Sequence, residues 1–357
     1  MDLHCEMLLQ EYRDFRESAN LLQKIAEDAL RSAIRQNGIY VTAIESRVKT
    51  ESSLAGKLEL KGQKYAHLSD ITDIVGARVI TFYSDEVDKV AALAENLFEI
   101  DWENSADKRK AYGIDRFGYM SLHYICRIPK ALYFDETHPE INTIRFELQI
   151  RTALQHVWAT VFHDMGYKTD VDIPKEYMRR MSCMAGMLEI ADREFLSFRT
   201  EVEDYRRKVR ALIRDRKFDE ILLDKDSFDS YLEIEPFRML NERIASINHA
   251  EIETVSMKPY LDALHTMGLE TLGDIERMKL QYSEDAYNLA RHQIGNTDLD
   301  IIASTKGIYS LCVVYLLKNG GGEADLLRFH EALYGKQERG TVMMKRLIAQ
   351  AQKANII

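Results

Sequence analysis

Cysteine is scarce in this 357-residue chain, and no two of its four cysteines form a CxxC pair: Cys5, Cys126, Cys183 and Cys312. Such spacing argues against a disulfide framework or a cysteine metal site and is typical of free thiols in a reducing compartment. Long apolar runs are also missing, because the longest, Tyr309–Leu317, falls short of the roughly 18 residues that a membrane span needs. The charged N-terminus carries no apolar signal region, so we expect a cytoplasmic protein without a membrane partner.

The chain also has fewer basic than acidic residues. The chain holds 48 Lys and Arg against 58 Asp and Glu, which gives a net charge of −10. Nonspecific binding to nucleic acid needs a basic surface, so this charge argues against it, while a local basic groove for nucleotide phosphates remains compatible with it. What the chain does have is the composition of an ordinary globular protein, 46% hydrophobic and 30% charged. Its length predicts about two domains.

The first half of the chain alternates between helical and extended patterns. Apolar residues recur at helical spacing over residues 6–36, and Gly38 then marks a helix stop. Helical periodicity returns at Glu86–Leu97 and Leu154–Met165. Four strand candidates lie before, between and after these segments: 39–49, Ala77–Phe82, Tyr119–Ile128 and Thr143–Ile150. This order of elements predicts one sheet covered by helices.

The second half reads as almost entirely helical. One or two extended helices are expected over Lys175–Arg216, with a domain boundary near residues 215–230. We therefore expect two domains, 1–220 and 231–357, of which the second is all-helical. The stretch His265–Met278 resembles a short helix-turn-helix unit, but plain helix capping accounts for its glycine and threonine more simply.

Two of the strand candidates carry a polar face. The segment TIRFELQIRT alternates strictly and places its polar side chains together: Arg145, Glu147, Gln149 and Arg151. Residues 119–125 alternate in the same way, with Tyr119, Ser121 and His123 on one side. A polar face on a strand inside a sheet indicates a catalytic cleft, although a salt-bridged solvent face would give the same pattern.

Cations and a carboxylate stand near these strands. Lys49, Ser53 and Lys57 are spaced by four, so we expect them on one helix face near its N-terminus, where the helix dipole adds positive charge. Asp73 precedes Gly76, which permits close backbone approach. Magnesium favours one or two carboxylates plus phosphate oxygens, so Asp73 suits a metal facing a triphosphate. The nearby Asp70 is expected to cap a local turn.

Four segments, in this order and spacing, resemble the synthetase domain of the RelA/SpoT family: RVKTESSLAGK (Arg47–Lys57), DIVGAR (Asp73–Arg78), GYMSLHY (Gly118–Tyr124) and ELQIRT (Glu147–Thr152). The resemblance covers roughly residues 10–200 and leaves the last part of the chain unassigned. It implies an α+β fold, with a mixed, nucleotidyltransferase-like β-sheet flanked by helices, followed here by the all-α C-terminal domain. It also implies a pyrophosphokinase that transfers the β,γ-pyrophosphate of ATP to the 3′-hydroxyl of GDP or GTP and makes (p)ppGpp.

The resemblance assigns roles to individual residues. Asp73 and Glu147 would be catalytic and would bind Mg²⁺, or Glu147 would assist deprotonation of the acceptor hydroxyl. ATP would be held by a cationic group with one arginine stacked on adenine: Arg47, Lys49, Ser53, Lys57 and Arg78. The acceptor nucleotide would contact residues of three further segments, with the tyrosine stacked on guanine: Tyr119, His123, Gln149, Arg151, His163 and Lys168. Trp158 is expected in the core.

Two features leave the acceptor open. Met120 occupies a position that is more commonly polar or basic in the family. How the acceptor's phosphates are bound is therefore left open. The basic stretch that contains Lys108, Arg109, Lys110 and Arg116 is either a loop that closes over the acceptor or a solvated basic loop.

Two other functions compete with (p)ppGpp synthesis. A toxin-type relative would modify tRNA 3′ ends or adenine nucleotides, with the C-terminal domain neutralising or sensing; the acidic net charge makes tRNA the less favoured acceptor. A non-catalytic nucleotide sensor is the other alternative, but it has no need of both carboxylates. We expect the C-terminal domain to be regulatory, and homo-oligomer formation is left open.

Overall fold

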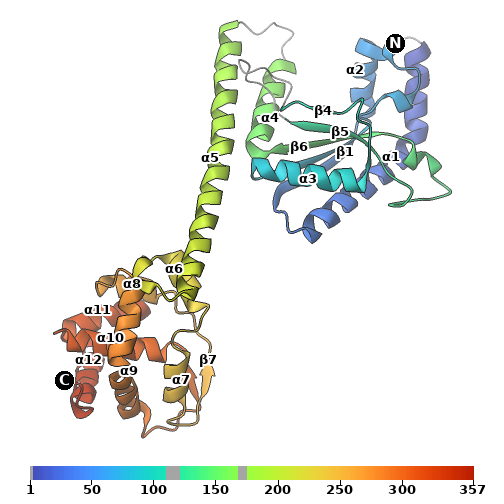
Figure 1. Cartoon of the computed structure of the whole chain (residues 1–357). Coiled ribbons are helices and arrows are strands. Elements are labelled where there is room, and N and C mark those ends of the chain that lie inside the picture. The colour runs from blue at the N-terminus through green and yellow to red at the C-terminus, as the bar shows by residue number, and fades with distance from the viewer. Residues whose placement is uncertain (1–2, 110–120, 168–174) are drawn as a thin grey trace. The chain divides into compact units, whose positions relative to one another are not determined.

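The computed structural model describes residues 3–109, 121–167 and 175–357, without the side chains of 163–167 and 175–176 (Figure 1). The chain divides into two units by its internal contacts, Met1–Thr200 and Glu201–Ile357. The predicted domain ranges, 1–220 and 231–357, stay predictions.

The first unit contains a sheet and helices that include most of the predicted elements. Its helices are α1 (Leu3–Gln36), α2 (Glu51–Lys61), α3 (Ser84–Leu97), α4 (Ala153–Tyr167) and the first part of α5 (Lys175–Arg214). Its strands are β1 (Val41–Val48), β2 (Val75–Thr81), β3 (Glu99–Ile100), β4 (Ala106–Asp107), β5 (Leu122–Arg127) and β6 (Phe146–Thr152). Short 3₁₀ turns occupy Gly62–Lys64, Leu68–Asp70 and Pro139–Asn142. The predicted fold class, a mixed sheet flanked by helices followed by a helical part, is confirmed.

The sheet has the strand order β1-β2-β6-β5-β3, and β4 also pairs with β5 (Figure 1). The central pair, β2 and β6, is parallel, whereas the other pairs are antiparallel. The pairing register creates two rows of residues across the strands: Arg47, Gly76 and Glu147 form the first, and Glu45, Arg78, Gln149 and His123 form the second. Residues that are far apart in sequence therefore share one face.

The opposite face of the sheet is the core of the unit. On β6 the side chains of Phe146, Leu148 and Ile150 are fully buried, while Glu147 and Gln149 between them are partly exposed, so the predicted alternation is confirmed. Helices α1 and α3 supply the other half of this apolar cluster. Because successive side chains on a strand point to opposite faces, packing on one side leaves the polar rows on the other.

Polar contacts attach the first part of α5 to this unit. The buried Asp192 accepts a hydrogen bond from the Thr152 hydroxyl at 2.7 Å. Arg199 forms an ion pair with Asp85 at 2.7 Å and lies over the ring of Tyr83. These contacts reach almost to the end of the unit at Thr200.

The second unit is built from helices around its own apolar core. They are α6 (Lys225–Leu232), α7 (Arg238–Ala245), α8 (Tyr260–Thr266), α9 (Leu272–Ile294), α10 (Lys306–Lys318), α11 (Glu323–Tyr334) and α12 (Gly340–Lys353), with a 3₁₀ turn at Phe218–Glu220. Val209 and Ile213, from the last turns of α5, are buried in this same core. Of the helices described, none combines the length and apolar character needed to cross a bilayer.

Two local details of the second unit bear on the predictions. A pair of three-residue parallel strands, β7 (Glu251–Glu253) and β8 (Ile301–Ala303), interrupts the expected all-helical pattern. The possible helix-turn-helix at 265–278 is explained by capping: Gly268 takes a φ of 81°, and Thr271 caps α9 by accepting a hydrogen bond from the Asp274 amide. A positive φ is easily reached only by a residue without Cβ.

The core contacts of α5 predict where the second unit must begin. A fragment of residues 201–357 should unfold cooperatively, whereas one starting at residue 216 lacks the buried Val209 and Ile213. Burial of such side chains is worth about 1.5–3 kcal/mol each, so the shorter fragment should be less stable by about 3–6 kcal/mol. Urea unfolding followed by circular dichroism measures the difference. Equal stability of the two fragments would show that the end of α5 is dispensable to this core.

Candidate active site

The candidate site is the polar face of the sheet in the first unit. Gly76 lies between Arg47 on β1 and Glu147 on β6 in the register of the strands. A Cβ built on Gly76 would meet nothing within 4 Å, so the space above this residue is open. The glycine thus leaves a gap between a cation and a carboxylate, where the backbone can be approached closely.

Asp73 is the most strongly paired carboxylate of this face. It lies in the turn just before β2, 3.0 Å from the Lys49 ammonium and 2.7 Å from that of Lys57. Burial raises the pKa of Asp73, but the hydrogen bonds and charges of the two lysines outweigh it and hold that pKa below its usual value. The side chain is 30% exposed, so it stays ionised and accessible at neutral pH.

The expected helix face of three residues is only partly correct. Helix α2 begins at Glu51 with Thr50 as its N-cap, so Lys49 precedes the helix and does not lie on its surface. Lys49 and Lys57 still converge, because both reach Asp73. Ser53 is exposed and takes part in the cap, where its amide donates to the Thr50 hydroxyl.

Glu147 is held by side chains on both sides. Nδ1 of His123 lies 2.8 Å from one carboxylate oxygen, and the Gln149 amide donates to the other at 3.1 Å. Burial raises the pKa of Glu147, and the charge of Asp73 adds to this, but the His123 hydrogen bond and charge lower it further, so the net pKa is depressed. Nε2 of His123 lies 2.6 Å from the Ser121 hydroxyl, which fixes the ring in place.

A second set of contacts continues across the sheet. Arg78 donates to Glu45 on β1 at 2.9 Å and to the side-chain oxygen Oε1 of Gln149 on β6 at 3.4 Å. Gln149 therefore links Arg78 to Glu147, and the chain of contacts runs from β1 to β5. Arg151, two residues further along β6, is only 3% exposed, which leaves it far less accessible than Gln149.

The two carboxylates are suitable ligands for a hard divalent cation. Asp73 raises the pKa of Glu147 through its charge, so the two groups are close enough to repel each other. No group of three or more His, Cys, Asp or Glu suited to a metal occurs among the residues that the structure describes. Asp73 and Glu147 are the residues that could hold Mg²⁺, which keeps waters and takes its remaining ligands from substrate phosphates.

Comparison with known proteins assigns this first unit. A family model described as the region found in RelA / SpoT proteins matches residues 46–172. The GTP pyrophosphokinase YwaC of Bacillus subtilis is 30% identical over 165 residues, which cover 44% of this chain and 74% of that protein. The chain belongs to the RelA/SpoT family. The GTP pyrophosphokinase YjbM of the same organism is 26% identical over 162 residues, covering 45% and 73% of the two chains.

A solved structure is also similar to this chain. The small alarmone synthetase 1 from Bacillus subtilis is 20% identical, with coverage of 55% of this chain and 99% of the other and a TM-score of 0.46. The family match at 46–172 lies entirely within the first unit, as do all the site residues assigned from sequence.

Sequence reasoning missed two side chains of this RelA/SpoT protein's polar face, Glu45 and His156. Glu45 pairs with Arg78. Ser121, which strand alternation had already placed on the polar side, contacts His123. His156, on α4, is close enough to Arg151 and Arg78 for their charges to act on it; burial first, and then these charges, lower its pKa, so its ring is neutral at pH 7. Strand alternation could have identified Glu45, whereas nothing in the α4 sequence placed His156 over the sheet.

Other predicted residues have plainer outcomes. Tyr119 and Lys168 lie outside the described residues, as do Lys110, Met120 and Arg116; His163 lies on α4, but its side chain is not described. Asp70 accepts hydrogen bonds from the amides of Ala66 and His67, so its capping role is confirmed. Trp158 is buried, as expected.

The His123 contact predicts a measurable change in Glu147. In His123→Leu the pKa of Glu147 should rise, because burial would then be opposed mainly by Gln149. Ser121→Ala is the matched control, since it removes a contact of His123 but leaves the bond to Glu147 intact. An NMR titration of the Glu147 carboxyl carbon measures both variants. An unchanged pKa in His123→Leu, or an equal rise in Ser121→Ala, would refute the assigned cause.

Proposed function

We propose that this chain transfers the β,γ-pyrophosphate of ATP to the 3′-hydroxyl of GDP or GTP, giving AMP and (p)ppGpp. The observation that carries the proposal is the arrangement of Asp73, bound by two lysines, and Glu147, oriented by His123, on one open polar face. Two relatives named GTP pyrophosphokinases support a pyrophosphokinase-type enzyme, and they favour a guanine nucleotide as acceptor.

The cations of this face suit the donor triphosphate. Lys49 and Lys57 are held in position by Asp73, and Arg47 stands across the open space at Gly76. Phosphoryl and pyrophosphoryl transfer depends chiefly on positioning and on neutralising the charge that moves to the leaving group. These three side chains would bind phosphate oxygens of ATP, while Arg78 would lie against adenine.

Asp73 and Glu147 would hold Mg²⁺, which when bound neutralises phosphate charge and polarises the phosphorus under attack. Both carboxylates have lowered pKa values, so at neutral pH they are ionised and ready to act as ligands. Glu147 lies next to β5, the strand expected to contact the acceptor. The buried His123 of that strand contacts the Glu147 carboxylate and would fix its orientation.

The transfer step can be written with its atoms in balance. The 3′-oxygen of the acceptor forms a bond to the β-phosphorus, and the bond from that phosphorus to the oxygen bridging it to the α-phosphate breaks. The hydroxyl proton passes to the Glu147 carboxylate, and AMP departs with the bridging oxygen. Glu147 is suited to this role because its oxygens are partly exposed while its orientation is fixed.

The charges of the chain favour a small nucleotide over tRNA as the acceptor. Arg109, in the basic stretch that contains Lys108 and Lys110, pairs with Asp88 at 2.8 Å and with Asp107 at 2.9 Å. Its charge is thus already compensated, which weakens the case for a phosphate-binding loop built on it. The net charge of −10 points in the same direction.

Loss of either carboxylate should abolish most of the activity. Asp73→Ala and Glu147→Ala should each lower turnover about 100-fold or more, since metal binding and proton transfer contribute several kcal/mol to the barrier. The assay incubates the protein with ATP labelled on its terminal phosphates and with GDP, GTP, ATP or bulk tRNA, and follows label transfer to each acceptor.

Asp70→Ala is the control for these variants. It removes a neighbouring carboxylate that caps a turn and does not contact the lysines, so turnover should stay within a few-fold of the original. Near-normal activity of Glu147→Ala would overturn its assignment. Transfer of label to tRNA or ATP in preference to GDP and GTP would reject the proposed acceptor while keeping the chemistry.

The acceptor base should depend on Tyr119. Because stacking of a base on an aromatic ring is worth about 1–3 kcal/mol, Tyr119→Ala should raise the acceptor KM by about tenfold and leave the KM for ATP nearly unchanged. Tyr119→Phe keeps the ring and should behave like the original protein. Steady-state kinetics with each substrate varied in turn measure the split, and equal effects on both KM values would assign Tyr119 a structural role.

A further inference from the structure

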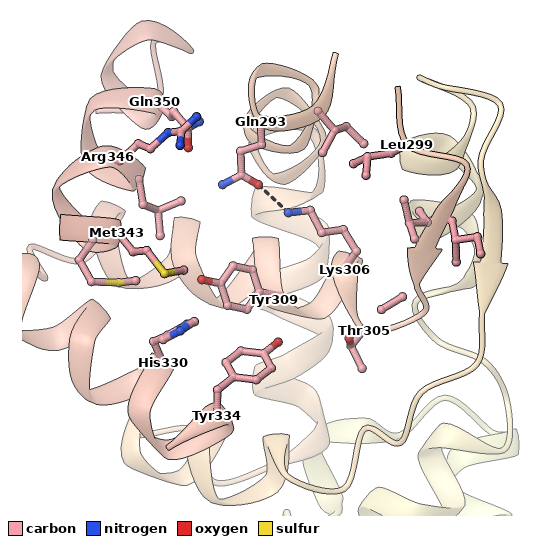
Figure 2. A pocket seen from close by; sticks show the side chains of 16 residues that line it. Gln293, Leu299, Thr305, Lys306, Tyr309, His330, Tyr334, Met343, Arg346 and Gln350 are labelled. Carbon is pink, nitrogen blue, oxygen red and sulfur yellow. Dashed lines mark hydrogen bonds between the residues drawn. The ribbon is translucent and has the colours of Figure 1, made fainter. Parts of the chain in front are cut away.

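The second unit contains a cavity of about 530 Å³ that the proposed function does not use. It lies among α9, α10, α11, α12 and β8, and Figure 2 shows its lining side chains. Pockets that bind small molecules usually measure about 300–1,000 Å³ and combine apolar walls with a few polar groups. The size alone therefore permits a ligand, and the chemistry of the lining defines which kind.

The charge of the lining has one sign. Lys306 and Arg346 are its charged members, and no Asp or Glu lines the cavity, although the whole chain carries a net charge of −10. No ion pair is described for either cation. The Lys306 ammonium donates to the Gln293 side chain at 2.6 Å, and burial lowers its pKa to about 8. Arg346 is exposed, whereas Lys306 is partly buried, and a partly buried positive charge without a counter-charge favours an anion.

His330 supplies an independent sign of a missing partner. Its side chain is only 5% exposed, and neither ring nitrogen has a hydrogen-bond partner. A buried polar group left without a partner is costly, so such groups are nearly always satisfied by protein, water or ligand. In Figure 2 the ring lies beside Tyr309 and Tyr334 at the cavity.

The remaining walls are aromatic and aliphatic. The rings of His330 and Tyr334 have centroids 4.8 Å apart, and Tyr309 lies 6.4 Å from both. Aliphatic and thioether side chains complete the lining: Leu299, Ile301, Ile302, Met343, Met344 and Leu347. Flat rings and flexible methionines suit a planar apolar body, since methionine adapts to irregular shapes and rings stack on rings.

We propose that this cavity is a binding site for a small planar organic anion, an aromatic ring system with one carboxylate or phosphate group. The anionic group lies between Lys306 and Arg346, and the ring packs against Tyr309 and Tyr334. His330 hydrogen-bonds to a polar atom of the ligand. The residues that line the cavity all belong to the second unit, whereas Asp73 and Glu147 lie on the polar face of the first unit, so this is a separate site.

The first test uses matched probes on the full-length protein. Isothermal titration calorimetry with 1-naphthyl phosphate, 1-naphthoate and the neutral 1-naphthamide compares one ring system with three head groups. At least one anion should bind about tenfold or more tightly than the amide, because a charge-assisted hydrogen bond is much stronger than a neutral one. Preference between the two anions distinguishes a phosphate from a carboxylate ligand. Equal binding of all three probes, or no binding of any, overturns the proposal.

The second test uses paired variants. Lys306→Gln and Arg346→Gln should each weaken binding of the preferred anion about tenfold, with little change in binding of 1-naphthamide. Lys345→Gln is the matched control, because it removes the same charge from an exposed neighbour on α12 that does not line the cavity. Circular dichroism and thermal unfolding check that each variant is folded. A loss as large in Lys345→Gln, or none in the Arg346 variant, sinks the assignment.

Discussion

The candidate active site depends on one continuous series of polar contacts across four strands. It runs from Glu45 through Arg78, Gln149 and Glu147 to His123, with separations between 2.8 and 3.4 Å. Each link joins neighbouring strands or neighbouring positions of one face, so it exists only in the observed register. A slip of β6 by one residue would turn Glu147 and Gln149 into the core and Leu148 onto the polar face. The apolar packing of β6 against α1 and α3 therefore fixes the geometry of the charged groups on the other side.

The same contacts decide the charge of the two carboxylates. Both are substantially buried, which by itself would favour their neutral forms, yet both have lowered pKa values because lysines surround Asp73 and His123 bonds Glu147. A carboxylate with a lowered folded-state pKa contributes stability above its ordinary pKa and loses it as pH falls through the folded value. The two carboxylates are thus ionised at neutral pH, and their stabilising contribution is lost only under acid conditions. The ion pairs that set the charge of these carboxylates thus also contribute to the stability of the fold.

Local sequence pattern predicted the parts of this protein that local rules control. Alternation in TIRFELQIRT identified the polar face of β6, and Asp70 and Thr271 were recognisable as caps, because these depend on residues a few positions apart. The rest required the tertiary fold. Lys49 lies ahead of α2 because Thr50 is the N-cap of that helix. The contact between His123 and Glu147 depends on the pairing of β5 with β6. The apposition of His156 to Arg78 depended on how α4 meets the sheet, which no periodicity encodes.

Two partly buried lysines show how the surroundings decide the behaviour of one residue type. Burial lowers the pKa of both Lys57 and Lys306, but at Lys57 the hydrogen bond and charge of Asp73 exceed that effect and raise the net pKa. Lys306 has no such carboxylate, so its pKa is lowered to about 8. The first lysine is stabilised by a built-in counter-charge. At the second, the hydrogen bond from the ammonium to Gln293 compensates burial only in part, so the ligand-free fold retains a cost that a bound anion would remove. A fold keeps such a cost most readily where the group serves binding, because an apolar residue at this buried position would be less costly.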